Sequence, residues 1–301
     1  MMYFYKLYGL VVKSGFVIPE AYNLPIQKDW DVEVELGTPP KEVLEQAYAG
    51  KICGLEKLET WFYLKDLGLF YIKDGKKIII HKESECLTDL SRNSYLTGTA
   101  MGLLLFQRDI IPFHSSGVAK NGKCIAIAGC SGAGKSTISL KLREKGCDFV
   151  TDDVSAISIQ EGVLMVSPSL PQQKVCKDAA IRMGYQLEEL IYIDEFRDKY
   201  AVRLQKGYMT DNIPLAAILE LEIVKGDKVE IQEITGLKKL QLLFRNIYRG
   251  YALNEIGMSP VMHNTLVQIA KIIPMYQIKR PTTGYHTEYI TDWIIEHMEK
   301  I

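Results

Sequence analysis

Apolar and polar residues alternate over much of the first 85 positions, and this period of two predicts short β-strands. The predicted strands cover residues 3–12, 32–36, 61–64, 69–72 and 77–81. Asp74-Gly75 supplies a hairpin turn between the last two strands, and Lys41 to Ala49 is predicted to form a short helix. We therefore expect a β-rich N-terminal part over residues 1–85.

The pattern changes to helical spacing over Leu87 to Gln107, where Thr88 or Asp89 supplies a start signal. Beyond residue 110, apolar strand patterns alternate with helical ones. The strands are expected at 125–128, 147–151, 156–159, 163–167, 199–203, 214–223 and 275–278, and the helices at 137–145, 238–251, 261–273 and 287–301. Such alternation is typical of an α/β domain. We divide the chain into 1–85, a connecting helix at 86–109, and an α/β domain at 110–301.

Composition narrows the classes of protein that this chain can belong to. The 301 residues are 47% hydrophobic with a formal net charge of −1, which gives a full core and no preference for a polyanion. Six cysteines without a C-x-x-C pair are typical of thiols in a reducing cytoplasm. No run of 18 apolar residues occurs, and Lys6, Lys13 and Glu20 interrupt the N-terminal apolar pattern. We expect a cytoplasmic protein with neither a nucleic-acid nor a membrane partner.

One stretch carries a specific chemical signal. Residues 129–136 (GCSGAGKS) fit G-x-x-x-x-G-K-[ST], between an apolar strand and a helical pattern. The glycines let the backbone N–H groups approach a phosphate, Lys135 adds positive charge, and the Ser136 hydroxyl suits Mg²⁺. The sequence therefore predicts binding of ATP and Mg²⁺. The nucleotide-binding residues are expected to be Gly129, Cys130, Ser131, Gly132, Ala133, Gly134, Lys135, Ser136 and Thr137.

Two carboxylates follow one helix and one strand later, at Asp152 and Asp153. The helix from Lys135 to Lys145 spans roughly 16 Å, and the strand over 147–151 spans about as much. If that strand runs parallel to residues 125–128, its C-terminal end returns to the glycine loop. A carboxylate pair at that place suits cation binding and general-base work.

A histidine is predicted to lie at the same level. Asn121-Gly122 between two apolar runs is a strong type I′ hairpin signal. In that hairpin, residues whose numbers sum to 243 face each other, so His114 falls opposite Gly129. A titratable imidazole is then expected beside the bound phosphates.

Three runs together resemble the HPr kinase/phosphorylase family, whose core is related to that of phosphoenolpyruvate carboxykinase. They are Phe113-His-Ser-Ser-Gly117, Gly129 to Ser136, and Gly146-Cys-Asp-Phe-Val-Thr-Asp-Asp153. The resemblance implies a P-loop kinase core within an α/β fold. It further implies Asp152 as catalytic base, Asp153 with Ser136 on the metal, and His114 and Lys135 at the transferred phosphoryl group.

A weaker resemblance extends to residues 68–75 (GLFYIKDG), Gln107-Arg108-Asp109 and Pro112-Phe-His114. These runs are similar to stand-alone HPr-kinase-like proteins, some of which phosphorylate the C-terminal serine of a lasso-peptide precursor. The resemblance implies transfer of the γ-phosphoryl group of ATP to a serine in a peptide or small protein, and an assembly larger than a monomer. The second signature of the HPr enzymes has no convincing counterpart beyond residues 243–246 (LFRN), so HPr is not the expected acceptor.

Two other functions fit the same residues. A small-metabolite kinase would need an enclosed polar pocket beside Asp152, whereas a peptide kinase needs an open cleft. A regulatory ATP-binding module would bind Mg·ATP without an acceptor. The sequence also leaves open the nucleotide base and the roles of four cations: Lys174, Arg203, Arg245 and Arg249.

Overall fold

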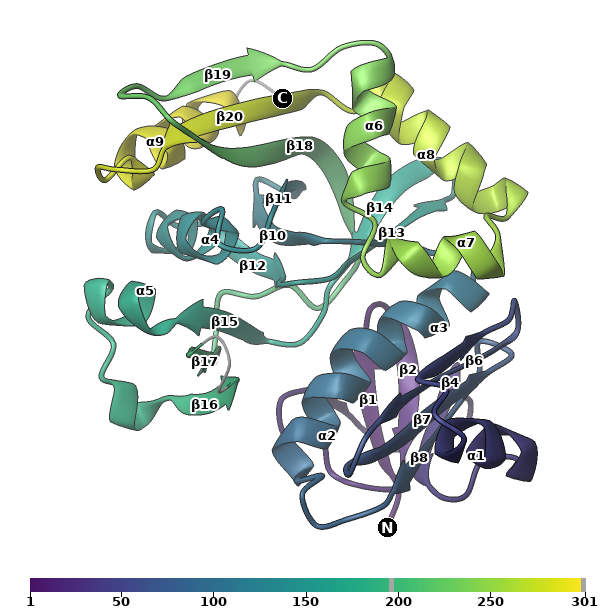
Figure 1. Ribbon diagram of the computed structural model, residues 1–301. Helices are drawn as coiled ribbons and strands as arrows, with labels where there is room; N and C mark the ends of the chain where they lie inside the picture. The colour runs from purple at the N-terminus through teal and green to yellow at the C-terminus, as the bar shows by residue number, and fades with distance from the viewer. Residues whose placement is uncertain (195–197, 299–301) are drawn as a thin grey trace.

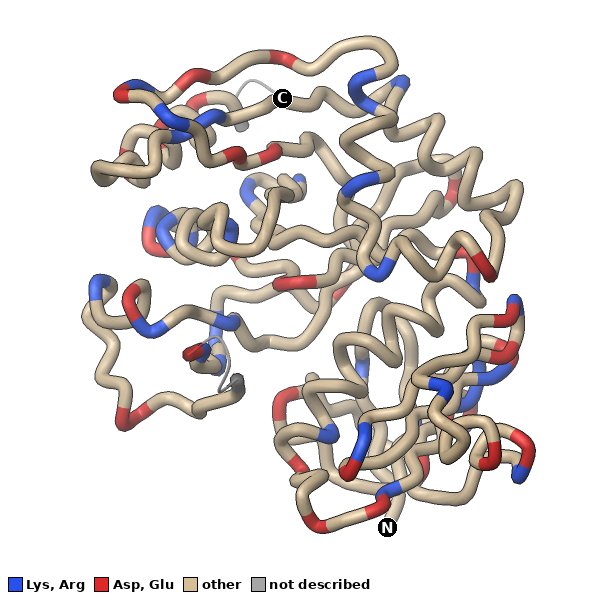
Figure 2. The backbone as a smooth tube through the Cα atoms, in the orientation of Figure 1, with Lys and Arg blue, Asp and Glu red and all other residues tan. Residues whose placement is uncertain are grey.

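The protein, seen here in a computed structural model, is described over residues 1–194 and 198–298. Within these residues the strands form three sheets of eight, nine and three strands, and helices pack on them, so the chain is a mixed α/β protein (Figure 1). Lys and Arg are interspersed with Asp and Glu across the view in Figure 2. None of the described helices is long and apolar enough to cross a membrane.

The eight-stranded sheet belongs to the N-terminal part and has the order β3-β1-β2-β4-β8-β7-β6-β5. Its elements are β1 (Tyr3–Leu7), β2 (Leu10–Ser14), β3 (Tyr22–Leu24), β4 (Val32–Leu36), α1 (Lys41–Tyr48), β5 (Cys53–Leu55), β6 (Glu59–Leu64), β7 (Gly68–Lys73) and β8 (Lys77–Lys82). The prediction of one strand over 3–12 is wrong, because the chain turns at Tyr8 (φ 53°) and Gly9 (φ 76°) to form the β1–β2 hairpin.

The predicted helix at 87–107 is confirmed, with a π-helical turn in its middle. Its segments are α2 (Asp89–Tyr95), η1 (Leu96–Ala100) and α3 (Met101–Gln107). Thr88 caps the start by accepting a hydrogen bond from the Ser91 N–H. Every residue of η1 is buried, and the run lies between the N-terminal sheet and the remainder of the molecule (Figure 1).

The nine-stranded sheet forms the centre of the second part. It contains β9 (Ile111–Phe113), β10 (Ser115–Lys120), β11 (Lys123–Gly129), β12 (Asp148–Thr151), β13 (Ser155–Gln160), β14 (Val163–Ser167), β18 (Ile213–Val224), β19 (Glu230–Glu233) and β20 (Met275–Pro281). The order is β12-β10-β11-β18-β14-β13-β9, and the far half of β18 pairs with β20. Strand β10 is antiparallel to both β11 and β12, so β11 and β12 run in the same direction with β10 between them.

A third, small sheet has the order β15-β17-β16 and stands next to this centre. Its elements are β15 (Gln172–Cys176), α5 (Lys177–Arg182), η2 (Leu187–Glu189), β16 (Ile191–Asp194) and β17 (Lys199–Arg203). The sequence predicted β17, but it did not predict β15. Pairing with β17 fixes β15, a contact between segments that are distant along the chain.

The side chains of β11 alternate between two apolar clusters, as the period of a buried strand requires. Ile125 and Ile127 pack with α4 (Lys135–Glu144) and α9 (Thr287–Met298) on one face of the sheet. Cys124, Ala126 and Ala128 belong to a larger cluster that also contains residues of β1, β7, α3 and β20. One continuous apolar core therefore joins the N-terminal sheet to the nine-stranded sheet.

The remaining helices close the other side of the nine-stranded sheet. They are α6 (Leu237–Arg245), η3 (Gly250–Ala252), α7 (Leu253–Ile256) and α8 (Pro260–Ile272). The prediction of a helix over 238–251 is wrong at its C-terminal end. After Arg245 the chain leaves the helix, because Ile247 forms a β-bridge with Phe113 and the Tyr248 N–H donates to the Pro112 carbonyl. The predicted last helix is confirmed to Met298, and residues 299–301 lie outside the described residues.

Candidate active site

The glycine loop joins β11 to α4 in the strand–loop–helix order that the motif requires. Gly129 has φ 137°, and a Cβ there would lie 2.5 Å from the Leu221 carbonyl oxygen, so only glycine fits. Gly134 has φ 102° and precedes the first residue of α4, Lys135. Thr137 lies in the first turn of α4, so all nine predicted nucleotide-binding residues are contiguous with the N-terminus of this helix. Such an N-terminus favours anions.

Lys135 folds back across the loop. Its Nζ donates hydrogen bonds to the carbonyl oxygens of Gly129 (2.7 Å) and Cys130 (3.3 Å), and it lies 3.2 Å from His114 Nε2. Burial lowers the pKa of Lys135, although the negative charges of Asp153 and Asp152 oppose that effect. The ammonium group is therefore held at the point where phosphate oxygens would meet the loop.

The predicted hairpin register is confirmed. Ser115 pairs with Ala128 and Lys120 with Lys123, and both turn residues, Asn121 and Gly122, have positive φ. His114 directly precedes β10, where its main-chain N–H donates to the Asn246 carbonyl oxygen (2.6 Å). Its imidazole is consequently placed beside the glycine loop, as the sum rule predicts.

The His114 ring is neutral in this environment. Burial lowers the pKa of His114, and the positive charge of Lys135 lowers it further. The Nδ1 atom lies 2.9 Å from the main-chain carbonyl oxygen of Asp153, so Nδ1 carries the proton and donates it there. Nε2 is then a free lone pair that accepts from Lys135 Nζ. The imidazole therefore links the loop lysine to the aspartate pair.

Asp152 follows the end of β12 and accepts three hydrogen bonds. Ser116 Oγ (2.6 Å) and Ser136 Oγ (3.3 Å) donate to Oδ1, and the main-chain N–H of Lys174 (2.8 Å) donates to Oδ2. Burial raises the pKa of Asp152, and the nearby charge of Asp153 adds to that rise. The hydrogen bond from Ser116 acts in the opposite direction but does not cancel the effect.

Asp153 has the opposite electrostatic character. Its φ of 71° is left-handed, which Asp tolerates better than most residues, and this turns the carboxylate toward other partners. Lys174 Nζ lies 3.6 Å and His114 Nδ1 3.5 Å from its two oxygens. Burial would raise the pKa of Asp153, but the surrounding cations, Lys174 foremost, hold it below its ordinary value. The pair thus combines one carboxylate that retains its proton more strongly with one that stays ionised.

The site also contains residues that the sequence analysis did not single out. Ser116 lies in the Phe-His-Ser-Ser-Gly run and could have been found there. Gln173 Nε2 donates to the Ser136 carbonyl oxygen (3.0 Å), and Arg280 Nε donates to that of Ala133 (2.8 Å). The ring of Tyr248 packs against His114 with centroids 5.8 Å apart. None of these three follows from local sequence, because each contact joins distant segments.

The four cations whose roles the sequence leaves open have different partners in the structure. Lys174 reaches the aspartates, as described above. Arg245 forms an ion pair with the buried Glu220 of β18, Arg249 donates to Thr99 Oγ1 (2.9 Å), and Arg203 lies 4.0 Å from Glu20. In the described parts of the chain, Lys174 alone of these four contacts the aspartate pair.

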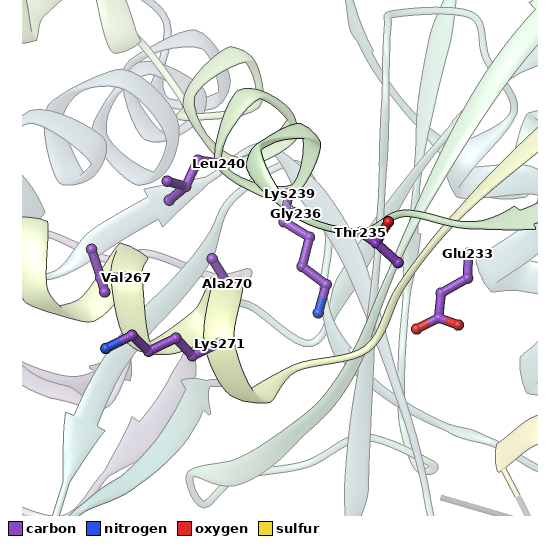
Figure 3. Close-up of a pocket in the computed structure, with 8 residues that line it drawn as sticks. All are labelled: Glu233, Thr235, Gly236, Lys239, Leu240, Val267, Ala270 and Lys271. Carbon is purple, nitrogen blue, oxygen red and sulfur yellow. The ribbon is translucent and has the colours of Figure 1, made fainter.

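Two further cavities lie away from the aspartates. One of about 350 Å³ lies between α6 and α8 and is lined by Leu240, Val267 and Ala270 together with two lysines (Figure 3). Another of about 390 Å³ lies along α6 and reaches Arg245. Neither is lined by Lys135 or by the aspartates, so the candidate site is the cluster at the C-terminal ends of β11 and β12.

The oxygen atoms of this cluster fit a hard cation. Among the described residues no group of three His, Cys, Asp or Glu side chains gathers for a metal. Ser136 Oγ and Asp152 Oδ1, however, lie 3.3 Å apart, and adjacent oxygen ligands of octahedral Mg²⁺ lie about 3 Å apart at bond lengths near 2.1 Å. A cation held partly by a nucleotide would find protein oxygens here.

Comparisons with known proteins show a likeness to solved structures and no match among sequences. No protein family model and no curated protein sequence matches the chain. Among solved structures, the HPr(Ser) kinase/phosphatase from Coxiella burnetii aligns at 14% sequence identity, covering 63% of this chain and 97% of that chain, with a TM-score of 0.33. A likeness at this score supports no inference about this chain.

Proposed function

We propose that the chain transfers the γ-phosphoryl group of Mg·ATP to a serine hydroxyl of a peptide or small protein, through a P-loop core of the HPr kinase type. One observation carries the proposal: a loop lysine, a loop serine, a neutral histidine and two carboxylates of opposite pKa shift meet at one end of β11 and β12. A protein that only bound nucleotide would need no half-buried carboxylate with a raised pKa beside the loop.

In the proposed phosphoryl transfer, each residue of the site has a separate role. The acceptor oxygen bonds to the γ-phosphorus, the bond from that phosphorus to the β,γ-bridging oxygen breaks, and ADP leaves. Asp152 takes the proton of the acceptor hydroxyl, and its raised pKa brings it closer to neutrality, where a general base is most effective. Lys135 and the loop amides neutralise the phosphate oxygens, and His114 holds Lys135 and the Asp153 main chain in place.

Mg²⁺, when bound, neutralises charge on the β- and γ-phosphate oxygens. We propose that Ser136 holds it together with Asp153, the carboxylate whose pKa is lowered. Because Asp152 also contacts Ser136, the two aspartate variants distinguish the roles. Asp153→Asn should raise the Mg²⁺ concentration for half-maximal activity, and Asp152→Asn should lower kcat at saturating Mg²⁺. The reverse result would exchange the two assignments.

The cavity beside Asp152 bears on the metabolite-kinase alternative. It is bounded by polar groups, as such an enzyme would need, but its volume is only about 20 Å³. About 10–15 Å³ on this measure holds one water, so a whole metabolite does not fit. An enclosed metabolite pocket at this cavity is therefore disfavoured.

The test uses γ-labelled Mg·ATP, the purified protein and a lysate of its own cell, beside the Asp152→Asn variant. A labelled peptide or protein band that disappears with the variant would support the proposal, and a synthetic lasso-type precursor ending in serine is the first defined acceptor to add. Label found only in small molecules would favour the metabolite kinase. Tight Mg·ATP binding without any transfer would favour a regulatory module.

A further inference from the structure

Strand β15 contacts two residues of the candidate active site from one side. Gln173 Nε2 donates to the main-chain carbonyl oxygen of Ser136 (3.0 Å), and the main-chain N–H of Lys174 donates to Asp152 Oδ2 (2.8 Å). Ser136 Oγ and Asp152 Oδ1 are themselves 3.3 Å apart. Neighbouring residues of one strand therefore hold both the serine proposed to bind Mg²⁺ and the proposed base.

The side chain of Gln173 is completely buried, and both ends of its carboxamide are paired. Oε1 accepts a hydrogen bond from Arg143 Nη1 (2.9 Å), while Nε2 donates to Ser136. A buried amide costs free energy unless it is hydrogen-bonded, and a fully bonded one holds its partners in a single arrangement. Gln173 therefore fixes the place of the Ser136 main chain.

Both partners of Gln173 belong to helix α4. Ser136 and Arg143 are seven residues apart, which is close to two helical turns, so they lie on the same side of the helix. Helix α4 packs on the nine-stranded sheet through apolar side chains, and such contacts are not directional. The hydrogen bonds of Gln173 are directional, so they set how the first turn of α4 lies relative to β15 and, through Lys174, to Asp152.

We propose that Gln173 is a positioning residue, which holds Ser136 where its hydroxyl and the aspartates can bind Mg²⁺ together with the nucleotide. The inference rests on the proposed function and adds to it a residue outside the glycine-loop motif. Groups that hold metal-binding residues in place typically contribute 10- to 100-fold to metal affinity. Loss of the Gln173 contact should therefore weaken the effect of Mg²⁺ on nucleotide binding.

The experiment measures ATP affinity by calorimetry, once with excess Mg²⁺ and once with EDTA. The ratio of the two affinities reports the contribution of the metal. Gln173→Met keeps the length of the side chain and removes both hydrogen bonds, so we expect the ratio to fall by about tenfold. ATP affinity in EDTA should change little, because Lys135 and the loop are unaltered. Gln186→Met is the control, since it makes the same substitution at an exposed position.

A second variant separates the two ends of the carboxamide. Gln173→Glu keeps an oxygen that accepts from Arg143 but presents no N–H to the Ser136 carbonyl oxygen. It should lower the ratio as Gln173→Met does. Thermal unfolding checks each variant, and Gln173→Glu carries the test if Gln173→Met does not fold.

The outcomes separate this inference from the proposed function. If the folded Gln173 variants keep the ratio of the natural sequence, or lose ATP affinity equally with Mg²⁺ and with EDTA, Gln173 does not position the metal-binding serine. The phosphotransferase function would stand in either case. If the natural sequence binds no Mg·ATP, the proposed function is wrong and this inference with it.

Discussion

Replacing Asp152 by Asn removes one half-buried negative charge and changes the hydrogen bonds around it. The carboxylate accepts from Ser116 and Ser136 on one oxygen and from the Lys174 N–H on the other. An asparagine whose oxygen faces the two serines presents its NH₂ group to the Lys174 N–H. That donor then loses its acceptor, which costs about 1–3 kcal/mol of folding free energy at any pH.

The charge change acts in the opposite direction and depends on pH. In the unfolded chain Asp152 has a pKa of about 3.9, and burial raises this value in the folded protein. The folded state therefore binds the proton more tightly, so stability falls as pH rises through the window between the two pKa values and remains lower above it. Each pH unit of that window contributes about 1.4 kcal/mol. Asn cannot ionise, so the variant does not lose folding stability in this way as pH rises.

Together the two effects predict that the difference in unfolding free energy between the variant and the natural sequence changes with pH, which denaturant unfolding can measure. At the acid end of the range the Asp152→Asn variant should be less stable than the natural sequence by about 1–3 kcal/mol. As pH rises toward 8 the difference should shrink or change sign, because only the natural sequence must ionise the half-buried carboxyl group of Asp152. Asp29→Asn is the control, since Asp29 is exposed and the substitution should leave a small difference at all pH values.

Enzyme activity completes the test of Asp152. Loss of a general base lowers kcat by about 10²- to 10⁴-fold, while Mg·ATP binding, measured by calorimetry, persists because Lys135 and the loop are unchanged. A stability difference that stays constant between pH 4 and 8 would refute the raised pKa. Wild-type turnover in the variant would refute the assignment of Asp152 as the base.

Three further predictions concern the loop and its histidine. Lys135→Met should weaken Mg·ATP binding by about 100-fold or more, measured by calorimetry, because a buried cation aimed at the phosphates is lost. His114→Asn should lower kcat with little change in nucleotide affinity, and the kcat of the natural sequence should show no inflection from His114 between pH 6.5 and 8, since burial lowers its pKa and keeps the ring neutral there. Gly129→Ala should destabilise the fold by about 1–3 kcal/mol in thermal unfolding, because it combines φ 137° with a contact 2.5 Å from the Leu221 carbonyl oxygen.

The parts of the site that sequence could predict are those fixed by local rules. The Asn121-Gly122 turn sets the β10–β11 register and therefore places His114, and the lengths of one helix and one strand return Asp152 to the loop. In each case turn chemistry or element length leaves a single geometric solution. The pattern-based prediction succeeded at these places for that reason.

The parts that sequence could not predict depend on contacts between distant segments. Helix α6 ends at Arg245 because Ile247 pairs with Phe113. The local sequence around residue 246 does not indicate that pairing. The hairpin turn at Tyr8 and Gly9 interrupts an alternation that reads as one strand. The cavity beside Asp152 has Tyr8 in its wall only because the hairpin turn packs against residues 167 and 168.

The apolar core that runs from β1 and β7 through α3 to Ala126 and Ala128 of β11 has a consequence for how the molecule moves. Because the N-terminal part and the second part share one core, we expect no hinge motion between them. On the proposed function, nucleotide and acceptor would then enter by local displacement of loops. For the same reason the slowest-exchanging amide protons of both sheets should report a single global opening. Mg·ATP bound at the glycine loop should therefore slow exchange in β2 as much as in β11.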